Sequence, residues 1–216
     1  MLDPDARRRF LNLAAGFEGS LVLVALFGGW VVGVNPLTPL QLDLWAIAVA
    51  VAATIPMFIM FLVFHYFPVG PFRRIRAFLI DVIGPILDTC RWYDLILLAA
   101  LAGLSEEILF RGLLQTWMGQ SEPVIGLIGS NVLFGLAHSI TLTYGLIAAA
   151  MGTYFGWLFD ATGERNRLIP VITHALYDYL AFLVVVRTVR QERKRVPADS
   201  QRGSADDDSV IESPVE

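Results

Sequence analysis

Long apolar segments separated by short polar ones dominate the chain. Each segment is close to the length of about 20 residues that a helix needs to cross about 30 Å of hydrocarbon. With Pro, Gly and charged residues taken as boundaries, the pattern predicts six membrane-spanning helices, at residues 14–34, 43–67, 94–118, 123–141, 143–160 and 168–187. We therefore expect an all-α membrane protein, a bundle of about six transmembrane helices.

Residues 71–93 differ from these spans. Their apolar side chains recur at helical spacing, but Arg and Asp residues lie between them. This pattern is typical of an amphipathic helix that lies in the membrane interface, and Gly84-Pro85 predicts a kink in it.

Composition supports the membrane class. Hydrophobic residues make up 56% of the chain, charged residues 17%, and the mean hydropathy is +0.61. A soluble domain of this size needs more polar surface. The net charge of −4 provides no basic surface for nucleic acid, and the single cysteine, Cys90, cannot form an internal disulfide.

The distribution of Lys and Arg predicts the orientation. Under the six-span interpretation, one side of the membrane has Arg7, Arg8, Arg9, Arg73, Arg74, Arg76, Arg91, Arg187, Arg190, Arg193, Lys194 and Arg195. The other side has only Arg165 and Arg167. Positive residues stay in the cytoplasm, so we expect a multi-pass protein of the cell membrane with both termini cytoplasmic. The first apolar segment has no small-x-small cleavage site, which favours a retained anchor over a cleaved signal.

The chain accordingly divides into four regions. Residues 1–70 are expected to be membrane-anchoring helices, 71–93 the interfacial helix, and 94–187 a catalytic helical core. Residues 188–216 contain few large apolar side chains and are expected to form a disordered, charged cytoplasmic tail.

Ionisable residues in the third predicted span indicate function. Glu106, Glu107 and Arg111 lie near mid-bilayer, where each unpaired charge costs a few kcal/mol. Glu107 and Arg111 are four residues apart, which suits an ion pair with a structural role. Glu106 points about 100° away from Glu107 and can face a cavity.

Two later spans contribute imidazoles. His138 lies in the fourth span, and His174 and Asp178 lie four residues apart on the sixth. In a hydrolytic site, Glu106 would activate water, and Asp178 would orient His174. His138 and His174 would either donate hydrogen bonds or, with Glu106, bind a divalent metal such as zinc. Ser105 and Ser139 lack a base partner, so water is the expected nucleophile.

Two further expectations concern packing residues and the depth of His138 in the membrane. Asn131, Phe134, Tyr177 and Tyr179 are interpreted as packing and interface residues. The predicted bounds also place His138 near the cytoplasmic end of its helix, about 10 to 15 Å from the depth of Glu106 and His174 at about 1.5 Å per residue.

The order of these motifs resembles a known family. Glu106-Glu107-x-x-x-Arg111, Phe134-x-x-x-His138 and His174-x-x-x-Asp178 are similar to the CPBP intramembrane proteases, which include CAAX prenyl endopeptidases and bacteriocin-processing and immunity-associated proteins. The resemblance covers roughly residues 90–187. It implies that Glu106 activates water while His138, His174 and Asp178 complete the site. The prenyl endopeptidases typically have Asn where this chain has Asp178, and the chain lacks a His-Glu-x-x-His motif, so a metal-bound and a metal-free site both remain open.

We therefore expect an intramembrane endopeptidase that acts on a peptide or membrane-associated protein. Two alternatives belong to other classes. One is a non-catalytic relative that binds a partner or confers immunity to a bacteriocin, although such a protein would not need Glu106, His138 and His174 in its membrane spans. The other is a small ion-coupled transporter, although the spans show no internal repeat.

Overall fold

The computed structural model describes residues 4–37, 40–161 and 165–208, with side chains described as far as residue 195. This part of the chain is helical and contains no strand, which confirms the all-α prediction. Its elements are α1 (Pro4–Val32), α2 (Leu44–Tyr66), α3 (Phe72–Phe78), the π-helical turn η1 (Leu79–Ile83), α4 (Gly84–Leu87), α5 (Trp92–Glu107), the π-helix η2 (Ile108–Gln115), α6 (Thr116–Met118), α7 (Pro123–Ala137), α8 (Leu142–Asp160) and α9 (Leu168–Asp208).

All six predicted spans are helical, but they are not equivalent. Within the described residues, four helices are long and apolar enough to cross a membrane: Asp5–Val32, Leu44–Tyr66, Leu142–Asp160 and Leu168–Arg195. Helix α7 has only 15 residues. The helical run from α5 through η2 to α6 is continuous, but its apolar sequence is interrupted by Glu106, Glu107 and Arg111. The protein is therefore an all-α membrane protein in which α7 and the run from α5 to α6 differ from regular apolar spans.

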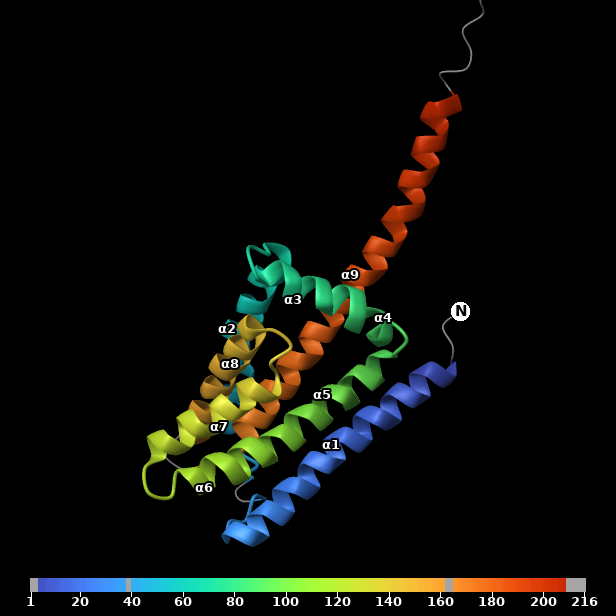
Figure 1. The fold of residues 1–216 in the computed structure, drawn as a ribbon. Helices are drawn as coiled ribbons and strands as arrows, with labels where there is room; N and C mark the ends of the chain where they lie inside the picture. Colours follow the sequence, from blue (N-terminus) through green and yellow to red (C-terminus); the bar gives the residue numbers. More distant parts are fainter. Residues whose placement is uncertain (1–3, 38–39, 162–164, 209–216) are drawn as a thin grey trace, which may run out of the picture.

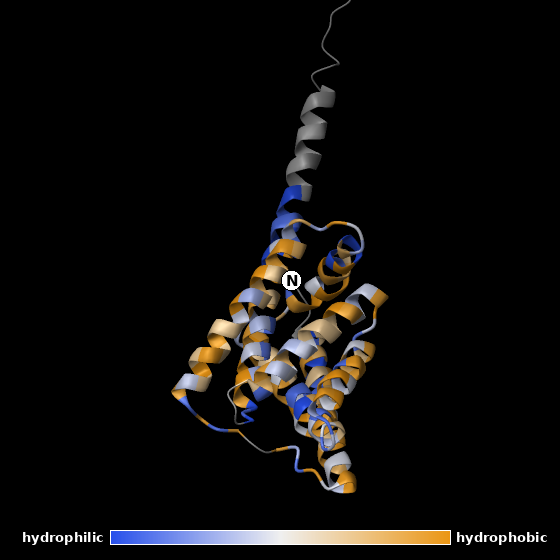
Figure 2. Ribbon diagram, turned by 90° about the vertical axis from the view of Figure 1, so that its left-hand side faces the viewer, coloured by the Kyte–Doolittle hydropathy of each residue, from blue (hydrophilic) through white to orange (hydrophobic). Residues whose placement is uncertain are grey.

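The outer surface of the bundle is apolar. Large side chains such as Trp30, Leu42 and Leu142 are 78%, 89% and 79% exposed. Figure 2 shows hydrophobic residues on the outer faces of the helices and hydrophilic residues where α9 leaves the bundle. An apolar exterior of this kind is stable in lipid rather than in water.

Helix α9 forms the centre of the packing. It contacts α2, α4, α5 and α8 (Figure 1). Its approach to α5 is close because Gly103 faces Ala175: a Cβ at Gly103 would lie 2.9 Å from the backbone nitrogen of Ala175. This close contact places the helix with Glu106 directly against the helix with His174.

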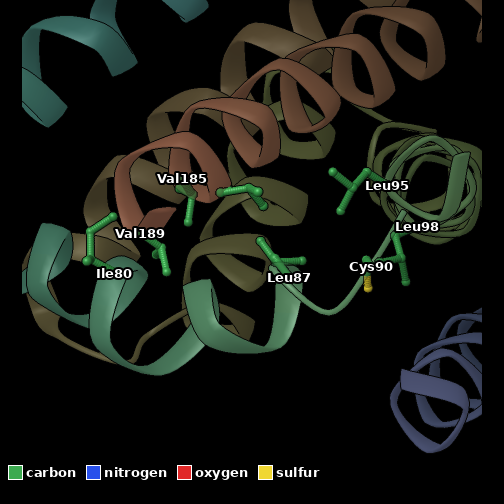
Figure 3. Close-up of a cluster of buried hydrophobic side chains, with 8 residues drawn as sticks. Ile80, Leu87, Cys90, Leu95, Leu98, Val185 and Val189 are labelled. Carbon is green, nitrogen blue, oxygen red and sulfur yellow. The ribbon is translucent and has the colours of Figure 1, made fainter. Parts of the chain in front are cut away.

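The amphipathic segment lies across one end of the bundle. The π-helical turn η1 directly precedes Gly84-Pro85, where the sequence predicted a kink. Figure 3 shows how the segment is attached to its neighbours: Ile80 and Leu87 face Val185 and Val189 of α9, while Cys90, Leu95 and Leu98 extend the cluster to α5. Burial of these side chains fixes the segment against the N-terminal half of α5 and the middle of α9.

Helix α9 does not end at residue 187, where the tail was expected to begin. It continues to Asp208, and Val189 is 7% exposed. Charged residues of this extension are also paired: Arg190 and Arg193 contact Asp88 at 2.6 and 2.8 Å. The composition of the tail predicted disorder, but apolar contacts and ion pairs to the amphipathic segment order its first turns. Residues 209–216 of the predicted tail lie outside the described residues.

Candidate active site

The two adjacent glutamates lie at the junction of α5 and the π-helix η2. Because they are consecutive, their side chains point in different directions. Glu107 is fully buried, and Glu106 is 8% exposed. π-Helical turns within longer helices are frequent at functional sites, because they change which side chains share a face.

Glu107 belongs to a packed polar network. Its Oε1 accepts a hydrogen bond from Nη1 of Arg111 at 3.0 Å, as the spacing predicted. Nη2 of Arg111 donates to Oδ1 of Asn131 at 2.9 Å and to the carbonyl oxygen of Gly152 at 2.5 Å. The guanidinium also lies 5.1 Å from the ring centre of Phe134. Arg111 thereby joins η2, α7 and α8.

His174 connects this network to a cavity. Its Nδ1 lies 3.0 Å from Oε1 of Glu107. A carboxylate only accepts hydrogen bonds, so Nδ1 carries the proton and Nε2 faces the cavity. Nε2 lies 3.5 Å from Oδ2 of Asp178 and 4.0 Å from Oε2 of Glu106. The ring of Phe155 stacks on the imidazole at 4.7 Å, which fixes its plane.

His138 approaches the same point from α7. Its Nδ1 lies 2.9 Å from the carbonyl oxygen of Phe134, so this nitrogen also donates. Its Nε2 then faces Oε2 of Glu106 at 3.8 Å. Phe134 stacks on the imidazole, with ring centres 4.4 Å apart, and so has a more direct role than the packing expected for it.

The expected depth mismatch between His138 and Glu106 is wrong. The prediction assumed that the fourth helix crosses the whole membrane and ends at residue 141. Helix α7 instead ends at Ala137, and His138 caps it inside the bundle. Counted from the loop before α7, His138 and Glu106 lie about 22 and 18 Å along their helices at about 1.5 Å per residue, which is nearly the same level.

The side chains of Glu106, His138 and His174 meet in a cavity of about 270 Å³. Glu106, His138, His174 and Asp178 all line it, and Tyr144 of α8 adds a hydroxyl. Oε2 is buried without a hydrogen-bond partner in both Glu106 and Glu107 across the described residues, but only Glu106 lines the cavity. Oε2 of Glu106 lies 3.8 and 4.0 Å from the two Nε2 atoms, distances too long for direct hydrogen bonds.

The donor atoms suit zinc, but their arrangement does not. Ligands bonded to one tetrahedral zinc at about 2.0 to 2.1 Å are about 3.3 to 3.5 Å apart. The carboxylate oxygen lies 3.8 and 4.0 Å from the two imidazole nitrogens. No group of three or more His, Cys, Asp or Glu side chains in the part of the chain that the structure describes has the geometry of a metal site.

Several residues at the site were missed from the sequence, among them Tyr144 and Phe155 of α8. Asn131, interpreted as packing, is a buried partner of Arg111. Its position three residues before Phe134 and seven before His138 puts it on the same helical face, and that was the available signal. Glu18 of α1 accepts a short hydrogen bond from Ser105, the residue before Glu106. A carboxylate inside the first predicted span was itself a signal.

Cys90 does not compete for the nucleophile role. It lies in the turn between α4 and α5, and it is 5% exposed. Burial raises the pKa of the Cys90 thiol. Since the thiolate is the reactive form, this cysteine is a packing residue of the cluster in Figure 3.

The comparison with family models covers the site. Residues 88–180 match the family described as type II CAAX prenyl endopeptidase Rce1-like. The match covers less than half of the chain and shows what this segment is similar to. The comparisons with curated proteins and with solved structures found no match. The Rce1-like segment runs from the end of α4 into α9 and contains Glu106, His138, His174 and Asp178. This match agrees with the resemblance drawn from the three motifs, and the segment is similar to a family of CAAX prenyl endopeptidases.

Proposed function

We propose that this protein is an intramembrane endopeptidase in which Glu106 activates water to hydrolyse a peptide bond. The observation that carries the proposal is the unpartnered Oε2 of Glu106, which faces two imidazole nitrogens in one cavity. A buried carboxylate oxygen without a partner is unfavourable unless another molecule binds it, and water in this position is ready for deprotonation.

The chemistry follows from the geometry. Glu106 removes a proton from the water molecule while the oxygen of that water forms a bond to the carbonyl carbon of the substrate. His174, between Glu107 and Asp178, supplies a positively charged N–H for the resulting oxyanion. His138 orients the water. As the C–N bond breaks, the proton held by Glu106 passes to the leaving amine. These steps need only the side chains and water.

Substrate and topology form part of the same proposal. The substrate is a peptide or a membrane-associated protein, because the cavity lies within an apolar bundle. Ion pairs join the N-terminal end of α1 to α5, and α4 to the extension of α9, which places the predicted cytoplasmic arginines at one end of the molecule. We propose that this end is cytoplasmic and that the protein resides in the cell membrane.

Cleavage of a peptide library by the purified protein in nanodiscs tests the function. The wild type and Glu106→Ala are compared, each with and without a chelator. We expect cleavage by the wild type that is lost in Glu106→Ala and unchanged by the chelator. Cleavage by Glu106→Ala would remove the proposed base, and loss with the chelator that zinc restores would show a metal enzyme. Binding of peptides without any cleavage would favour the non-catalytic alternative.

A further inference from the structure

The cavity extends well beyond the catalytic groups. From Glu106 it continues between α2, α9 and the amphipathic segment, and its wall there is mostly aromatic and aliphatic. Along α9 the lining residues run from His174 to Val185. Eleven residues of helix correspond to about 16 Å, and an extended peptide of about five residues covers that distance.

Arg76 of α3 lies at the far end. Among the described residues that line the cavity, it is the one arginine or lysine. Its position is fixed from two sides: Nε donates to the carbonyl oxygen of His65 at 3.1 Å, and Nη2 contacts Oε1 of Glu192 at 2.8 Å. His65 is itself held by Thr188 of α9 at 2.9 Å. These two contacts of the Arg76 region on α9, Thr188 and Glu192, lie 14 and 18 residues after His174. That is about 21 to 27 Å along the helix, a distance that an extended peptide of about seven residues covers. The guanidinium is thus placed at the opposite end of the cavity from the catalytic group.

The partner of Arg76 is exchangeable. The side chains of Arg76 and Glu192 are 31% and 45% exposed. Half-exposed ion pairs contribute little net free energy, so another carboxylate can replace Glu192 with little loss. The planar guanidinium is suited to bidentate binding of a carboxylate. Glu192 therefore occupies the position in which an acidic group of a bound peptide would lie.

We propose that Arg76 is a specificity-determining residue that binds a carboxylate of the substrate about seven residues from the scissile bond, a spacing set by helix rise and peptide length. Glu192 is its counter-ion in the free protein. The preferred substrate is then an apolar peptide segment followed by an acidic side chain or a free C-terminus. This inference rests on the proposed function, because the scissile bond defines the distance.

Peptides with one glutamate at increasing distance from the cleaved bond test the proposal. Glutamate is placed at about two, seven or twelve residues from the scissile bond, on either side, and each peptide has a glutamine twin. A second set compares a free with an amidated C-terminus, which distinguishes the two sources of the carboxylate. We expect a KM about tenfold lower for the acidic peptide only at the middle distance, with kcat unchanged.

Variants assign the effect to Arg76. Arg76→Gln should remove the difference in KM between the acidic peptide and its glutamine twin. Arg74 is an exposed residue of the same helix, and Arg74→Gln should keep the difference between the two peptides. Glu192→Gln should lower KM for the acidic peptide a few-fold. Equal changes for both twins in Arg76→Gln would show a purely structural role, and discrimination that persists in this variant would overturn the proposal.

A binding measurement separates this proposal from the proposed function. The same peptides are titrated against Glu106→Gln protein in nanodiscs, with and without Arg76→Gln. An Arg76-dependent preference for the acidic twin supports the site even if the wild type cleaves nothing, in which case only the protease proposal fails. Equal affinity for the twins overturns the Arg76 site, whatever the wild type cleaves.

Discussion

Glu106 and Glu107 are neighbours in the sequence, yet they occupy two different regions of the buried polar cluster. Glu107 lies on the packed side, where its Oε1 accepts hydrogen bonds from Arg111 and His174. Glu106 lies on the cavity side, where the imidazole nitrogens of His138 and His174 are 3.8 and 4.0 Å from its Oε2. The packed side supports the positions of the groups, and the cavity side leaves room for a reactant. Identical side chains in one helix thus differ in their surroundings, and those surroundings determine what each can do.

Substitution of each glutamate by its isosteric amide should separate the two regions most strongly. Glu106→Gln should lower the cleavage rate at least about 100-fold, because the general base is lost. Its melting temperature should stay within about 2 °C of wild type. Glu107→Gln should instead lower the melting temperature, since Arg111 loses its ionic partner. Rate assays and thermal unfolding in detergent provide the measurements. If Glu106→Gln retained a tenth of the activity or more, the two regions would not differ as proposed.

Removal of the buried cation should damage the packed side next most severely. Arg111→Met leaves Glu107 charged and Asn131 without its partner, and we expect a loss of about 3 to 5 kcal/mol in the free energy of unfolding. Arg73→Met, at an exposed position of α3, is the matched control. The yield of monodisperse protein and its unfolding midpoint measure the effect. A well-folded Arg111→Met protein would contradict the structural role of the network.

A single methyl group should also disturb the packed side. In Gly152→Ala the new Cβ would lie 2.5 Å from Oδ1 of Asn131 and 3.2 Å from Nη2 of Arg111. Overpacking of this kind costs about 1 to 3 kcal/mol. Gly16→Ala is the control, because nothing lies within 4 Å of its Cβ. Equal unfolding midpoints for the two variants would show that the network tolerates displacement.

The smallest effect is expected where α1 meets the site. Ser105→Ala removes the hydrogen bond to Glu18, and we expect a loss of about 1 kcal/mol in stability. The cleavage rate should fall less than threefold, since Ser105 is not among the residues that line the cavity. Ser20→Ala serves as the control, because the Ser20 hydroxyl bonds only within its own exposed helix turn. A rate loss as large as that of Glu106→Gln would place Glu18 and Ser105 in the chemistry.

Helical spacing predicted part of this site correctly. Glu107 and Arg111 were expected to pair because they are four residues apart, and they do so at 3.0 Å. His174 and Asp178 share a face for the same reason and lie 3.5 Å apart. Contacts between helices were not predictable in this way. No pattern in the chain indicated that His174 would bind Glu107, or that Asn131 would bind Arg111, because spacing along one helix contains no information on the rotation of its neighbour.

The chain by itself determined that this is an all-α membrane protein, where its apolar helices lie in the sequence, and which charged side chains lie within the apolar layer. Those properties depend on hydrophobicity and on the 3.6-residue period, and both are local. Only the tertiary structure decided that Glu106 faces a cavity while Glu107 is packed, that α7 ends at the depth of the site, and that the extension of α9 reaches Arg76. These arrangements depend on how close two helices can approach, as at Gly103 and Ala175, and that distance is set by side chains far apart in the sequence.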